Sequence, residues 1–61
     1  MFDTKVVIIS EIYEDDDASM ARLVTRTNLF MEGKMIKSVV FERGEIMNMI
    51  VVYEQPIPAK N

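Results

Sequence analysis

The sequence predicts an α+β domain of element order βαββ, in which one helix packs on one face of a three-stranded antiparallel sheet. Three observations predict this fold. A short run near the start is rich in Val and Ile, the next segment repeats its apolar residues at the helical period, and two further apolar runs flank a tight turn. We expect the last strand to lie between the other two.

The first strand is expected at residues 5–13, KVVIISEIY, because Val, Ile and Tyr favour strands and the run is too short for a typical helix. Four acidic residues at 14–17 then interrupt the apolar pattern. An Asp at this point is a candidate N-cap, which predicts a helix that begins near Ala18. The same acidic run could also bind a hard cation, but its spacing does not match a calcium-binding loop, so we favour capping.

The helix is expected to bury one stripe of side chains spaced at the helical period. Gly33 follows the stripe and suits a left-handed C-terminal cap, and Lys34 lies close to the negative end of the helix dipole. The predicted stripe consists of Met20, Leu23, Val24, Thr27, Phe30 and Met31.

Residues 35–42 and 45–54 are predicted to form a hairpin whose loop is Arg43 and Gly44, with a positive φ at Gly44. This loop would place Phe41 opposite Ile46. The chain is expected to be a single domain over residues 1–61, ordered over about residues 4–54. Two prolines in residues 55–61 predict an extended tail.

Both faces of the predicted sheet are mostly apolar, whereas a single helix can cover only one of them. We therefore expect a homodimer or higher oligomer, packed sheet against sheet or joined edge to edge by strand addition. The short chain has no cysteine and no histidine for a disulfide or a metal site, which leaves association as the route to added stability. The expected interface residues are Met35, Val39, Phe41, Ile46, Ile50 and Val52.

The outer helix face carries Arg22 and Arg26 with no acid three or four residues away. These arginines could simply be solvated. Alternatively, they could meet an acidic or phosphate-bearing partner, with Leu29 as an apolar anchor beside them.

Composition excludes several classes of function. A net charge of −3 and an isoelectric point near 4.7 argue against nucleic acid as a partner. No apolar run approaches the roughly 20 residues of a membrane helix, and the first residues do not resemble a signal peptide, so we expect a cytoplasmic protein without a membrane partner. Without histidine or cysteine, the serines have no evident activating base, and we expect no catalytic residues, metal or cofactor.

Four segments of the chain carry a resemblance to a known family, which are residues 5–9, 28–31, 35–41 and 50–54. Through them the chain resembles the small sporulation-associated proteins of Gram-positive bacteria and their phages. That family has no established function, and the resemblance implies no catalytic residues. We expect a non-enzymatic protein-interaction or regulatory module that forms a homo-oligomer and could bind a host protein. The alternative is a protein that sequesters an anionic small molecule such as a nucleotide at a subunit interface, through Arg22, Arg26, Lys34 or Lys37.

Overall fold

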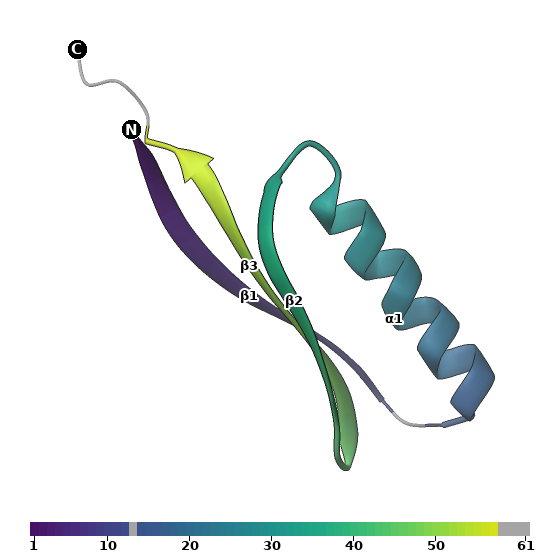
Figure 1. Cartoon of the computed structure of the whole chain (residues 1–61). Helices are drawn as coiled ribbons and strands as arrows, with labels where there is room; N and C mark the ends of the chain where they lie inside the picture. The colour runs from purple at the N-terminus through teal and green to yellow at the C-terminus, as the bar shows by residue number, and fades with distance from the viewer. Residues whose placement is uncertain (13, 58–61) are drawn as a thin grey trace.

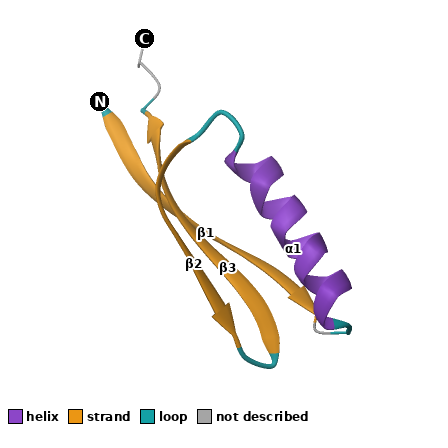
Figure 2. Cartoon of the chain, turned by 45° about the vertical axis from the view of Figure 1, so that its right-hand side comes forward, coloured by secondary structure: helices purple, strands orange, loops and turns teal. Residues whose placement is uncertain are grey.

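The protein is described by a computed structural model that covers residues 1–12 and 14–57. The chain forms β1 (Phe2–Ile12), α1 (Asp16–Met31), β2 (Met35–Arg43) and β3 (Ile46–Pro56), as Figure 1 shows. The three strands make one antiparallel sheet in the order β1-β3-β2, with α1 along one side of it (Figure 2). The predicted α+β class, the βαββ order and the central position of the last strand are confirmed.

The acidic run starts the helix, as predicted for an N-cap. Asp15 has an extended backbone, and its carboxylate accepts hydrogen bonds from the backbone N–H groups of Asp17 at 3.0 Å and Ala18 at 3.1 Å. Ser19, which is completely buried, accepts in turn from the N–H groups of Glu14 and Asp15. Two side chains therefore satisfy N–H groups that the first helical turn would otherwise leave without a partner.

The helix ends where a left-handed residue was predicted. Gly33 has a φ of 73°, and the N–H group of Lys34 donates to the carbonyl oxygen of Met31 at 3.1 Å. The Lys34 ammonium group donates to the Phe30 carbonyl at 2.8 Å, and it lies 4.3 Å from the centre of the Phe30 ring. The predicted location of Lys34 at the negative end of the dipole is confirmed.

The core is small and lies between α1, β1 and β3. Leu23 of the helix packs against Ile9 and Met47, and Leu23 and Val51 are completely buried. Four side chains on the margin of this cluster are half-buried: Val7, Met20, Phe30 and Met49. Thr27 is buried too, because its hydroxyl donates to the Leu23 carbonyl one turn earlier. The predicted stripe is thus on the buried side of α1, except that Val24 is 41% exposed.

β1 and β3 pair over their whole length, from Phe2 opposite Pro56 to Ile12 opposite Ile46. Gln55 and Pro56, which the sequence placed in the tail, therefore belong to the last strand, and the Ile57 N–H group donates to the Met1 carbonyl at 3.1 Å. Tyr13, the expected end of the first strand, and tail residues 58–61 lie outside the described residues.

The hairpin between β2 and β3 differs from the prediction. Phe41 lies opposite Met49 and not opposite Ile46, which is a shift of three residues. The loop is Gly44 and Glu45, in which the Gly44 N–H group donates to the Ile46 carbonyl at 3.0 Å, and Gly44 does not have a positive φ. Because this shift is odd, the β2 side chains from Ser38 onwards share a face with the opposite set of β3 side chains from the one predicted. Met35 and Ile36, which precede the register shift in β2, move by two residues and keep the predicted set.

The register defines two faces of the sheet, since cross-strand partners point to the same side. The helix-side face contains the buried residues Ile9, Met47 and Val51. We call the opposite side the far face. Its members are Phe2, Thr4, Val6, Ile8, Ser10, Ile12, Met35, Ser38, Val40, Glu42, Ile46, Asn48, Ile50, Val52, Glu54 and Pro56. Lys37, at the register shift, joins them through its ion pair with Glu54.

The two glycines give a matched test of this backbone. Gly33→Ala should lower the free energy of unfolding by about 1–2 kcal/mol, because a side chain strains the left-handed conformation although open space surrounds it. Gly44→Ala should be neutral or stabilising by about 0.4–1 kcal/mol, since its φ is not positive and the added carbon would only touch the Ile46 carbonyl oxygen at 4.0 Å. Urea denaturation of both variants tests this, and equal losses would contradict the backbone described for Gly44.

Candidate functional site

The far face is organised as cross-strand rows of three residues each. The two middle rows are Val6, Val52 and Ser38, followed by Ile8, Ile50 and Val40. Five of these six side chains are apolar. Val6 is 62% exposed and Ile8 is 60% exposed, so the apolar centre of the face is open to water. Nothing within residues 1–12 and 14–57 covers it.

Polar rows border this apolar centre at both ends. The row on one side consists of Thr4, Glu54 and Met35. Ser10, Asn48 and Glu42 form the row on the other, where the Ser10 hydroxyl donates to the Asn48 side-chain oxygen at 2.5 Å. Ile12 and Ile46 continue the face beyond it. An apolar centre with a polar rim is the usual composition of a protein–protein interface.

The size of the far face also suits an interface. The 11-residue β1 extends about 37 Å, and three strands span about 14 Å, so the flat footprint is on the order of 500 Å². Two such faces in contact would remove on the order of 1,000 Å² from water, which is the lower limit for a specific protein interface. Soluble monomers seldom expose apolar patches larger than a few hundred Å².

The two edges of the sheet are less suited to pairing than its far face. On β2 the register shifts between Ile36 and Ser38, which places the charged Lys37 at an irregularity in the edge strand. On β1 the Arg26 guanidinium donates to the Ser10 carbonyl at 2.7 Å. Bulges and charges are common devices that discourage edge pairing.

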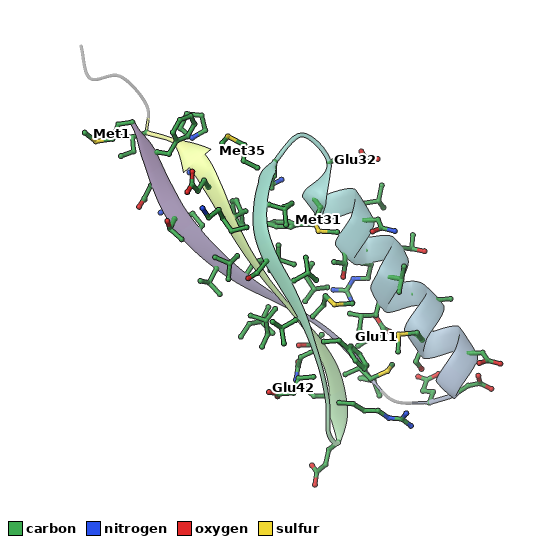
Figure 3. The ribbon with its side chains drawn as sticks, in the orientation of Figure 1. Met1, Glu11, Met31, Glu32, Met35 and Glu42 are labelled. Carbon is green, nitrogen blue, oxygen red and sulfur yellow. The ribbon has the colours of Figure 1, made fainter. Side chains whose placement is uncertain are left out.

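Arg22 and Arg26 join the helix to β1 through a shared carboxylate. Nε of Arg22 donates to Oε1 of Glu11 at 2.9 Å, and NH1 of Arg26 donates to Oε2 at 2.7 Å. Glu11 is on the helix-side face and lies in the gap between the sheet and α1 (Figure 3). The two arginines are one helical turn apart, so both reach the same carboxylate.

This arrangement changes the ionisation of the carboxylate. The hydrogen bond from Arg22, followed by that from Arg26, holds the pKa of Glu11 below its ordinary value of 4.5. The same contact raises the pKa of the Arg22 guanidinium, with smaller contributions from the charges of Glu14 and Asp15. Glu11 is therefore ionised at neutral pH, and it fixes α1 on β1.

The expected partner site on the helix is not assembled as an open anion site. Arg22 and Arg26 turn towards Glu11, and a shallow hollow of about 370 Å³ beside them is lined by Ala21, Arg22, Thr25 and Arg26. Leu29 is 62% exposed and makes an apolar point on the helix surface. Anions at this hollow would compete with Glu11 for the guanidinium groups.

The other candidate cations lie apart from these arginines. Lys34 is bound to the Phe30 carbonyl at the end of α1, and Lys37 lies 3.4 Å from the carboxylate of Glu54. The Phe30 ring meets Tyr53 edge to face, with 5.2 Å between the centroids. The four cations proposed to bind an anion are therefore distributed over three regions of the chain.

The structure divides the six expected interface residues between the two faces. Four of them share the far face, as the prediction expected: Met35, Ile46, Ile50 and Val52. The placement of Val39 and Phe41 with them is wrong, because these two residues pair with Val51 and Met49 on the helix-side face. The prediction also missed Val6, Ile8, Ile12 and Val40, which the register brings to the far face.

Comparisons with known proteins found no match to a family model, a curated protein or a solved structure. Within the described residues, no helix is long and apolar enough to cross a membrane. The same part of the chain contains no group of three side chains that could hold a metal ion.

The Glu11 contact predicts a specific pH dependence. Because the pKa of Glu11 is lowered on folding, its contribution to stability is present above pH 4.5 and is lost as the pH falls below that value. Glu11→Gln should therefore lower the denaturation midpoint at pH 7 and bring variant and wild type closer together at pH 3. Glu45→Gln, in the hairpin loop, is the control. A difference from wild type that stays constant between pH 7 and pH 3 would contradict this role for Glu11.

Proposed function

We propose that this chain is a non-enzymatic interaction module that acts as a homo-oligomer through the far face of its sheet. The observation that supports it is the exposed apolar centre of that face, bordered by polar rows. Burying apolar surface is the main favourable contribution to protein association. A face of this kind is more stable against a second surface than in water.

The small core gives association a second advantage. Among the described residues, only four apolar side chains are buried, which are Ile9, Leu23, Met47 and Val51. A chain of this length obtains limited stability from one core, and binding between folded subunits stabilises them by mass action. Self-association would therefore contribute to folding as well as to function.

Edge-to-edge association is the weaker arrangement for this chain. Adding a strand to β2 or β1 would leave Val6 and Ile8 in water, because their side chains point perpendicular to the sheet. Packing the two far faces together covers both. The irregularity at Lys37 and the hydrogen bond from Arg26 to β1 also favour the face over the edges.

Sequestration of an anion has less support. The two arginines already bind Glu11, and Glu14 and Asp15 add negative charge near Arg22. A thermal-shift experiment with a panel of nucleotides would detect this alternative, since a ligand that binds the folded state raises its melting temperature.

The oligomeric state is the direct test of the proposal. Light scattering after size exclusion should give about twice the 7.1 kDa chain mass, or a higher multiple, at micromolar concentration. Ile8→Lys should shift the protein to the monomer, because it places a charge in the apolar centre of the far face. Leu29→Lys is the matched control, since Leu29 is equally exposed but lies on α1. A wild-type monomer, or equal dissociation by both variants, would refute the proposal.

A further inference from the structure

We infer that two copies pack far face on far face about a twofold axis that runs across the strands, so that Lys37 of each copy meets Glu42 of the other. This inference rests on the proposed self-association and adds the partner surface and its orientation. It follows from the order of the rows on the far face and from the charges at the two ends of β2.

The rows are nearly symmetric about the middle of the face. Two apolar rows lie at the centre, and a row with polar residues lies on each side at equal spacing. A twofold axis across the strands, between the two apolar rows, places each strand over its own copy in the opposite direction. Val6 then faces Ile8 of the second copy, and Val52 faces Ile50. The apolar rows therefore meet only each other near the axis.

The same axis places unlike polar groups opposite each other. The row with Thr4 and Glu54 meets the row with Ser10 and Asn48 of the second copy. Asn48 accepts a hydrogen bond through its side-chain oxygen, so its NH₂ group can donate to the Glu54 carboxylate. Every polar row thus faces a row that can bind it.

The charges of β2 agree with this orientation. Met35 and Glu42 lie towards opposite ends of the strand (Figure 3), and Lys37 follows Met35 at the register shift. Lys37 is on the far face, because its ammonium group lies 3.4 Å from the Glu54 carboxylate. When β2 lies antiparallel over its copy, the Lys37 end of one copy covers the Glu42 end of the other. Two symmetric ion pairs form.

The other axis for aligned sheets runs along the strands, and it lacks this complementarity. It places β3 over its own copy in the same direction, so that the two Glu54 carboxylates meet at the centre of the sheet. Glu42 would face Ser10, and Lys37 would face β1 near Thr4. Like charges across an interface oppose binding, which favours the axis across the strands.

Charge reversal tests the orientation. Glu42→Lys should weaken the dimer about tenfold, because two attractive pairs become repulsive. Adding Lys37→Glu should restore part of the affinity, since the pairs between the copies re-form with exchanged charges while the contact of Lys37 with Glu54 in its own chain is lost. Glu32→Lys, at the end of α1, makes the same charge change away from the far face and should leave the dissociation constant unchanged. Sedimentation equilibrium in low salt measures all four proteins, and the effects should shrink in 1 M salt.

Cross-linking gives a second measurement that does not depend on charge. The chain has no cysteine, so Lys37→Cys and Glu42→Cys each introduce a single thiol. A short bis-maleimide should join a mixture of the two variants efficiently and each variant alone poorly, because like positions are about 14–20 Å apart along the strands. Two results would overturn the orientation while self-association stands: a dimer that Glu42→Lys does not weaken, and equal cross-linking in all samples. A monomeric wild-type chain would instead refute the proposed function itself.

Discussion

The structure depends on one geometric constraint, which is that a single helix covers two strands and not three. α1 packs against β1 and β3, and its core residue Leu23 contacts Ile9 and Met47 of these strands. β2 lies beyond this cover, and every one of its nine residues is exposed. With no second helix within residues 1–12 and 14–57, the far face is also open. The surplus of apolar surface follows from the element order itself.

Glu11 determines where on the sheet the helix lies. It shares a face of β1 with the core residue Ile9, and both helix arginines bind it. This shared carboxylate holds α1 at the β1 side of the sheet and away from β2. The half-exposed Val24 on the opposite flank of the helix agrees with that displacement. An ion pair at one edge of the core thus contributes to the exposure of β2.

Local sequence patterns were sufficient for the fold class, the strand order and both helix ends, because Asp15 and Gly33 act through neighbouring backbone groups. They were not sufficient for the hairpin register. Arg43 and Gly44 suggested a two-residue loop, but the chain turns one residue later and β2 contains an irregularity at Lys37. Glu11 was missed because its partners are 11 and 15 residues away. Glu11 alternates along β1 in step with Val7 and Ile9, and this pattern could have placed it on the helix-side face.

The error in register matters because the side chains of a strand alternate with a period of two. A three-residue shift moved Val39 and Phe41 to the helix-side face, yet it brought Val40 to the far face in their place. The far face stayed apolar because β2 has apolar side chains on both of its faces. Its interior polar pair, Ser10 with Asn48, is already hydrogen-bonded within the chain. A second surface over that pair would cover a hydrogen bond that is already formed, which lowers the desolvation cost that opposes association.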